Sequence, residues 1–226
     1  MYFDRTYVLV LIGILITAIA SLNVKNSFDK YSKIKSKNGY DGYNTALKIL
    51  DYYNVNYVKI KKTKNALSDY YNPSKEIIAL SEETYNDSSI ASIAVAAHEC
   101  GHVIQYKQGY FPIKIKAGIV PVVNFASTMS IPLIILGAFM SYNQTLINLG
   151  LILFFSVVVF QLVTLPIEFN ASKRALSILN ETEILDEEEL VYARKMLVAA
   201  ALTYVASTLA TALQFLRLLI LFRDRD

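Results

Sequence analysis

Three long stretches of the chain contain no Asp, Glu, Lys, Arg or His. They cover residues 6–24, 117–167 and 196–216, which are 19, 51 and 21 residues long. A helix needs about 20 apolar residues to cross a hydrocarbon core of about 30 Å. The first and third stretches therefore predict one spanning helix each, over 6–24 and 196–217. We expect the first to be a retained anchor rather than a cleaved signal, because no convincing small-x-small cleavage site follows it.

The second stretch is too long for one span, because as a single helix it would measure about 75 Å. The most polar segment within this stretch is Ser141-Tyr142-Asn143-Gln144. This predicts a reversal between two helices, over 117–140 and 146–167. Pro121 and Pro132 are expected to bend the first of them. The chain is then a multi-pass membrane protein with four transmembrane helices.

Four spans place residues 25–116 and 168–195 on one side of the bilayer, and both termini on the other. Lys and Arg near the span ends number twelve on the first side and four on the second. Cytoplasmic segments carry such an excess of positive charge. We therefore predict that the soluble parts face the cytoplasm. The twelve are Lys25, Lys30, Lys33, Lys35, Lys37, Lys107, Lys114, Lys116, Lys173, Arg174, Arg194 and Lys195, and the four are Arg5, Arg217, Arg223 and Arg225.

In the soluble parts, the spacing of apolar residues predicts both helices and strands. After a Lys- and Ser-rich connector over 25–37, apolar spacing predicts an amphipathic helix within 39–54 and a strand over 57–61. Residues 67–71 and 76–80 flank the turn residues Asn72-Pro73-Ser74 and predict a hairpin. Strand 76–80 is also a candidate edge for pairing with an extended substrate, with an ordinary sheet edge as the equal alternative.

Two further helices carry the polar residues of most interest. One is expected over about 89–107, capped by Asp87, Ser88 or Ser89 and ended by Gly109. The other is expected over about 168–180, with Pro166 fixing its start. The connector that follows ends in an acidic cluster at 186–189, which we interpret as the start of the helix leading into the last span.

Composition narrows the function classes. Hydrophobic residues make up 54% and charged residues 18%, and the mean hydropathy is +0.36, which excludes a disordered or coiled-coil chain. The net charge of +3 makes nucleic acid a poor partner. Cys100 is the single cysteine, so no intrachain disulfide can form.

Both histidines of the chain belong to one motif, His98-Glu99-Cys100-Gly101-His102. On a helix, positions i and i+4 project from the same face, so the two imidazoles can bind one Zn²⁺. Glu99 lies about 100° round the helix from His98, close enough to reach a metal-bound water without ligating the metal. Gly101 leaves room for another element to approach. The alternative is a pair of structural histidines.

A catalytic zinc needs three protein ligands and one open position. No third histidine exists, so the third ligand must be Asp, Glu or Cys100, and Cys100 lies about 200° from His98 on the helix. Glu168 is the best candidate, because it is the first charged residue after the 117–167 stretch. The pair of spans returns the chain there to the side it left at Lys116. A solvated carboxylate at the membrane boundary is the alternative.

Two segments, Ala94–Gln105 and Pro166–Ala175, together resemble the YugP-type family of bacterial membrane zinc metallopeptidases. The stretch from Tyr71-Asn72-Pro73 to Leu80-Ser81 also resembles that family. More distantly, HExxH with Glu-x-x-Ala is similar to the membrane gluzincins, including the heat-shock membrane protease and the CAAX prenyl protease.

The resemblance implies His98, His102 and Glu168 as ligands of one catalytic Zn²⁺ and Glu99 as general base. It implies an α-helical membrane protein with four transmembrane helices and a small α+β zincin-like cytoplasmic catalytic domain, which hydrolyses peptide or protein substrates, including membrane-associated ones. In the distant relatives an Asp four residues after the third ligand orients a histidine. Ser172 occupies that position here, so Asn170 and Ser172 are the candidates for orienting a histidine.

Three other functions compete with this interpretation. A site-2-type intramembrane protease needs an Asp ligand within the membrane, and no Asp occurs in the three uncharged stretches. A non-catalytic, zinc-stabilised membrane adaptor is disfavoured, because a purely structural zinc site does not need the Glu99 carboxylate. A transporter is disfavoured because the spans contain no ionisable residue that could form a relay. For the oxyanion-stabilising group, Arg174 and Tyr192 are candidates.

Overall fold

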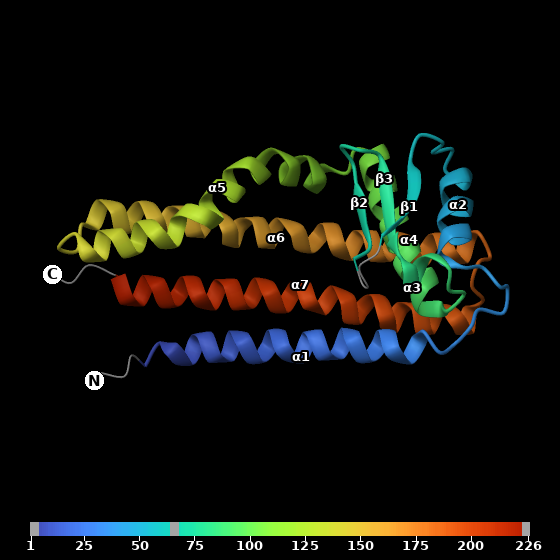
Figure 1. The fold of residues 1–226 in the computed structure, drawn as a ribbon, viewed down its shortest axis with the longest axis horizontal. Coiled ribbons are helices and arrows are strands. Elements are labelled where there is room, and N and C mark those ends of the chain that lie inside the picture. Colours follow the sequence, from blue (N-terminus) through green and yellow to red (C-terminus); the bar gives the residue numbers. More distant parts are fainter. Residues whose placement is uncertain (1–4, 64–67, 223–226) are drawn as a thin grey trace. The chain divides into compact units, whose positions relative to one another are not determined.

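A computed structural model describes residues 5–63 and 68–222 (Figure 1). The predictions made for Leu67, Arg223 and Arg225 lie outside the described residues. The chain divides into two compact units, which we describe separately. Unit 1 contains the segments up to Ser21, Lys114–Pro166 and from Leu202 onward, and unit 2 contains Leu22–Ile113 and Ile167–Ala201. Four long helices contribute residues to both units.

Four helices are long and apolar enough to cross a membrane: α1 (Tyr7–Tyr31), α5 (Phe111–Phe139), α6 (Gln144–Glu181) and α7 (Glu187–Phe222). Their segments in unit 1 expose many large apolar side chains, as a helix in contact with lipid does. Examples, with exposed fractions, are Leu11 (61%), Val122 (56%) and Ile152 (66%). The prediction of four apolar helices is confirmed. The chain reverses between α5 and α6 at residues 140–143, and α5 is bent, with Pro121 and Pro132 inside it (Figure 1).

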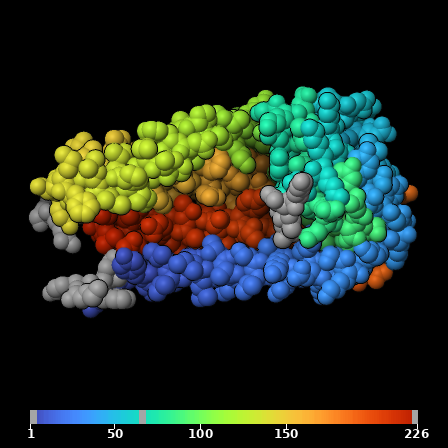
Figure 2. All heavy atoms as spheres, viewed as in Figure 1, coloured from blue at the N-terminus to red at the C-terminus, as the bar shows by residue number. Residues whose placement is uncertain are grey.

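Glycines allow the helices of unit 1 to pack closely. A Cβ at Gly13 of α1 would lie 3.2 Å from the Ala210 Cβ of α7, and the two helices lie side by side (Figures 1 and 2). A Cβ at Gly150 of α6 would lie 2.8 Å from the Ser130 carbonyl oxygen of α5. Small residues at helix contacts are typical of packing within membranes.

Unit 2 holds the shorter helices and the strands. These are α2 (Gly42–Tyr52), β1 (Lys59–Thr63), β2 (Tyr70–Asn72), β3 (Ile77–Ser81), α3 (Glu82–Tyr85) and α4 (Ile90–Lys107). Strands β2 and β3 form the predicted antiparallel hairpin, and β1 pairs with β3 in parallel. The order is therefore β1-β3-β2. Because β3 is paired on both sides, the hypothesis that strand 76–80 offers a free edge to substrate is wrong.

The α4 helix forms where the sequence predicts it. The Ser89 side chain accepts a hydrogen bond from the Ser92 amide and caps the first turn. Gly109 follows the last turn at φ +64°, a left-handed conformation that glycine adopts without strain. One face of α4, from Ile90 to Ile104, joins the buried core of unit 2 together with residues of α2, β3, α6 and α7.

The boundaries of α6 and α1 differ from the expectation. Pro166 does not begin a new helix, since α6 continues through it to Glu181. Proline removes one backbone hydrogen bond, but Ile167 and Ala171 just beyond it are buried, and this packing keeps the helix continuous. Helix α1 extends to Tyr31, so the first part of the expected connector over 25–37 is helical.

The acidic cluster begins α7, as predicted. The Asp186 carboxylate accepts a hydrogen bond from the Glu189 amide, and the Glu189 carboxylate accepts one from the Asp186 amide. This reciprocal pair is a capping box. Glu189 also accepts a hydrogen bond from the Lys37 amide, which ties the segment after α1 to the start of α7.

Candidate metal centre

The two imidazoles project from adjacent turns of α4 into one place in unit 2. The ring centroids of His98 and His102 lie 4.8 Å apart, and the rings are nearly perpendicular. Both side chains are partly buried, with 14% and 16% of their area exposed. The i, i+4 spacing therefore gives the shared face that the sequence predicts.

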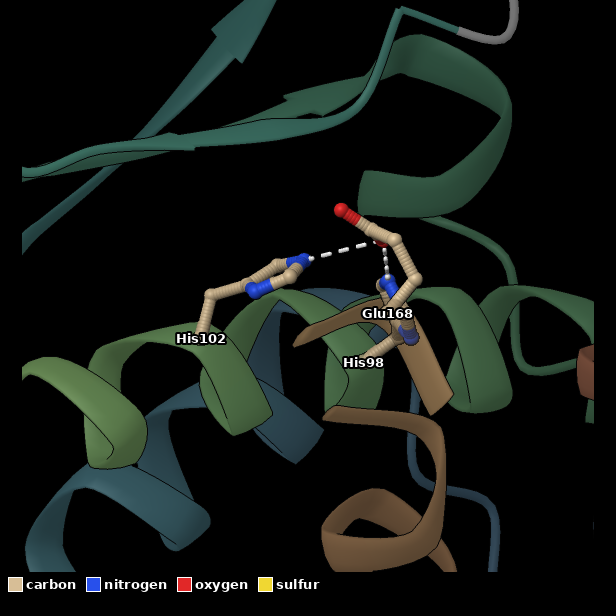
Figure 3. Close-up of side chains that lie close together, drawn as sticks. All are labelled: His98, His102 and Glu168. Carbon is tan, nitrogen blue, oxygen red and sulfur yellow. Dashed lines mark ion pairs between the residues drawn. The ribbon is translucent and has the colours of Figure 1, made fainter. Parts of the chain in front are cut away.

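Glu168 of α6 completes the group. Its Oε2 lies 3.4 Å from His98 Nε2 and 3.5 Å from His102 Nε2, and Figure 3 shows both imidazoles directed at this oxygen. The ligand atoms of the three residues all lie within 4.8 Å of one another. Two imidazole nitrogens and one carboxylate oxygen are a donor set that suits Zn²⁺ and leaves a fourth position open. The residues therefore fit a divalent metal ion.

Gly101 brings the two helices together. A Cβ at this position would lie 2.6 Å from the carbonyl oxygen of Ala171 in α6, closer than real Cβ contacts. The missing side chain thus lets the α6 backbone pass against the turn of α4 between the two histidines. The close approach expected at Gly101 is confirmed, and α6 is the element that makes it.

The Gln105 side chain joins one ligand to the other helix, and the sequence analysis missed its role. Its Nε2 donates to the backbone carbonyl of Ile167, at 2.8 Å, and to Asn170 Oδ1, at 2.9 Å. A carbonyl can only accept, so the amide nitrogen must face α6 and Oε1 must face His102 Nδ1, 3.0 Å away. His102 Nδ1 is then the protonated nitrogen, and Nε2 presents its lone pair to the centre.

Unlike His102, His98 is oriented by a residue of α6. Its Nδ1 lies 3.1 Å from Ser172 Oγ. Asn170 and Ser172 were the two candidates for orienting a histidine. Ser172 contacts His98, whereas Asn170 accepts a hydrogen bond from Gln105. Asn170 Oδ1 also accepts a hydrogen bond from Arg174 Nε at 2.7 Å. The spacing of Gln105, three positions after His102 on the same helix face, is the signal that could have identified it.

Glu99 lies beside the histidines in a buried position, with 7% of its area exposed. Burial raises the pKa of its carboxyl group, whereas the neighbouring imidazoles of His102 and His98 act in the opposite direction. The carboxylate is therefore electrostatically coupled to both imidazoles. A carboxyl group beside a candidate metal centre is a residue type that can act as a general acid or base.

Three other residues considered from the sequence make contacts elsewhere. Cys100 is fully buried, and its Sγ faces the Ala46 carbonyl of α2 at 3.8 Å, as expected of a small core residue. The Arg174 guanidinium donates to Asn170 and to Gln108. Tyr192 stacks on Tyr31 with ring centroids 5.8 Å apart.

Helices apolar enough to span a membrane and a cluster of two histidines and a glutamate define a membrane protein with a candidate zinc centre. The family model described as "Putative neutral zinc metallopeptidase" matches residues 6–223. The chain therefore belongs to this family of zinc metallopeptidases, which confirms the resemblance seen in the sequence. It is 41% identical over 203 residues to the "Putative membrane protease YugP" of Bacillus subtilis (strain 168), covering 90% of each chain. No solved structure matches significantly.

Proposed function

We propose that this protein is an integral-membrane metalloendopeptidase that hydrolyses peptide bonds with one zinc ion held by His98, His102 and Glu168. The observation that carries the proposal is the convergence of two Nε2 atoms and one carboxylate oxygen from two helices that are distant in sequence. A helix pair packed only for stability has no need to bring three ligating side chains together. Membership of a zinc metallopeptidase family supports the same function.

We assign the general base to Glu99. A bound zinc ion supplies Lewis acidity and makes a water more acidic. Glu99 accepts a proton from the water that attacks the scissile carbonyl and transfers it to the departing amine nitrogen. Its buried position keeps bulk water away from the carboxylate and strengthens its electrostatic coupling to the site.

Gln105 and Ser172 are positioning residues in this proposal. Gln105 fixes the tautomer of His102 and, through the Ile167 carbonyl, holds the α6 backbone directly before Glu168. One amide thereby sets the relative position of ligands from two helices. Ser172 holds the imidazole of His98. Residues that hydrogen-bond to metal ligands in this way hold the ligands in the binding orientation in the metal-free protein.

We propose that unit 2 forms a zincin-like catalytic domain facing the cytoplasm. The excess of Lys and Arg near the span ends on the unit 2 side supports this orientation. Because Glu168 directly follows an uncharged stretch of the chain, the centre is expected near the membrane surface. Peptides or proteins at that surface, including membrane-associated ones, are the expected substrates.

Metal content and proteolysis of the purified protein test this function. Protein in detergent should contain one zinc per chain and cleave a casein-type substrate, and a chelator should abolish cleavage until zinc is restored. Glu168→Gln should lose zinc and activity together, whereas Glu181→Gln, an exposed position on the same helix, should keep both. Full activity of the Glu168→Gln variant would contradict the ligand assignment.

The same experiment separates a peptidase from a zinc-stabilised membrane adaptor. An adaptor would hold one zinc, lose thermal stability on chelation and show no cleavage with any amount of zinc. Glu99→Gln provides the second arm, because an adaptor gains nothing from that carboxylate. A peptidase loses cleavage in this variant, yet keeps its zinc.

A further inference from the structure

A groove in unit 2 lies apart from the residues of the metal centre. It has a volume of about 740 Å³ and lies between α6, from Phe169 to Asn180, and α7, from Glu187 to Ala201. We call it the α6–α7 groove. None of His98, His102, Glu168 or Glu99 lines it, so the proposed peptidase function does not account for it.

We propose that the α6–α7 groove binds an anionic phospholipid, with an acyl chain on its apolar surface and the phosphate between Lys173 and Arg194. The apolar surface is exposed in the structure. Phe169 is 46% exposed, Val191 48% and Val198 51%, and all three line the groove. Apolar side chains in such number at a groove indicate an apolar ligand.

Charge selects the class of lipid. Lys173 and Arg194 both line the groove and are exposed, and neither has a hydrogen bond or an ion pair within residues 5–63 and 68–222. Glu187 is the single acidic residue of the lining, near the start of α7. Two available cations beside an apolar surface complement one phosphate carried on an acyl chain. Basic pockets between helices at the cytoplasmic membrane surface bind anionic headgroups in this way.

The order of residues along both helices places the apolar end of the groove next to the uncharged stretches and the two cations one turn beyond it. Phe169 lies two residues after the uncharged stretch that ends at residue 167, and Val198 lies within the one that begins at residue 196. Lys173 follows Phe169 by four residues, and Arg194 precedes Val198 by four. One helical turn, about 6 Å, therefore separates the apolar end from the cations on both helices. An acyl chain entering from the membrane would bring its phosphate to that level.

A peptide fits the groove less well. Extended peptides bind through backbone hydrogen bonds to a strand edge, and both walls of this groove are helices whose backbone groups are internally paired. A lipid requires only the apolar contact and the two cations. The groove also adjoins the metal centre through Ser172, which lines it and contacts His98. A bound lipid would therefore pack against the helix turn that orients one ligand.

Native mass spectrometry of the protein in neutral detergent tests the proposal, with phosphatidylglycerol and phosphatidylcholine of identical acyl chains as probes. A cation near the membrane surface contributes about fivefold in affinity for an anionic lipid. The wild type should thus prefer phosphatidylglycerol by about 25-fold. The double variant Lys173→Gln/Arg194→Gln should lose this preference, and the exchange Lys173→Arg/Arg194→Lys should keep it if the variant folds.

Lys195→Gln is the matched control, because this exposed cation is next to Arg194 but does not line the groove. Equal loss in the control would show diffuse surface charge and overturn the proposal, as would equal binding of both lipids by the wild type. Cross-linking of a peptide substrate to the groove, with lipid binding unchanged in the double variant, would assign the groove to the substrate instead. The Glu99→Gln protein should show the same lipid preference, so this result stands apart from the peptidase function.

Discussion

The α4 and α6 halves of the metal centre are built by different means. On α4, the two histidines, the proposed base Glu99 and the supporting Gln105 lie within eight consecutive residues, so the geometry of a single helix sets their spacing. On α6, Glu168 reaches the centre only because Gly101 admits the α6 backbone and Gln105 holds the Ile167 carbonyl. The α4 half thus depends on local helix geometry, whereas the α6 half depends on tertiary packing.

This difference predicts two kinds of variant. A change at the proposed base Glu99, which is not a ligand, should leave the metal in place and affect the reaction. A change at the contact between the helices should affect metal affinity or folding, and the reaction only as a consequence. Measuring zinc content, thermal stability and cleavage rate on the same samples separates the two.

Glu99→Gln should have the largest effect on cleavage. The amide has nearly the same size as the carboxylate but cannot accept the proton, so kcat should fall by about 10²- to 10⁴-fold. Zinc content should remain at one per chain, because Glu99 is not among the three converging ligands. Glu83→Gln, an exposed position on α3, is the control and should be unchanged. Loss of zinc in Glu99→Gln would show that Glu99 belongs to the ligand set.

Gln105→Met tests the connection between the two halves. The apolar side chain keeps the volume but removes the hydrogen bonds to His102, Ile167 and Asn170. Zinc affinity, measured by competition with a chelator, should fall about 10- to 100-fold. In the metal-free protein, the NMR signal of the His102 Nδ1 proton should be lost or shifted.

Gln108→Met is the control for this variant. Gln108 directly follows α4 and contacts Arg174, but it touches no ligand. Its zinc affinity should match the wild type. An unchanged affinity in Gln105→Met would mean that the helix alone orients His102, and it would remove the positioning role.

Gly101→Ala should destabilise the contact between the helices. The added methyl group would meet the Ala171 carbonyl at 2.6 Å, so α4 or α6 must shift. Overpacking of this kind costs about 1–3 kcal/mol, which should appear as a lower unfolding temperature in the metal-free protein. Gly118→Ala on α5, where nothing lies within 4 Å of the added atom, should have no such effect. Equal stability of the two variants would show that α6 adjusts without cost.

The sequence alone predicted the α4 half well, because local signals define it. The Ser89 cap, the i, i+4 histidines and Gly109 each specify the helix through neighbours close in the chain. Glu168 was also identified, by the return of the chain after two spans. Its role as a ligand remains a prediction that the geometry supports.

What the sequence did not predict depends on packing. Pro166 has the local character of a helix start, but burial of Ile167 and Ala171 beyond it extends α6. The central position of β3 depends on its parallel pairing with β1, which no turn between them encodes. Gln105 had a visible spacing, yet its partners on α6 become neighbours only after folding.

Ser172→Ala should have the smallest of these effects, and it sharpens the comparison of the two halves. Here a residue of α6 supports a ligand of α4, through one hydrogen bond of 3.1 Å to His98 Nδ1. A single hydrogen bond contributes about 0.5–1.5 kcal/mol, so zinc affinity should fall about two- to tenfold, less than in Gln105→Met. Ser177→Ala, on the exposed side of α6, is the control. If Ser172→Ala weakens zinc binding more than Gln105→Met, the α6 half orients the histidines more strongly than α4 does, and the division drawn between the two halves is wrong.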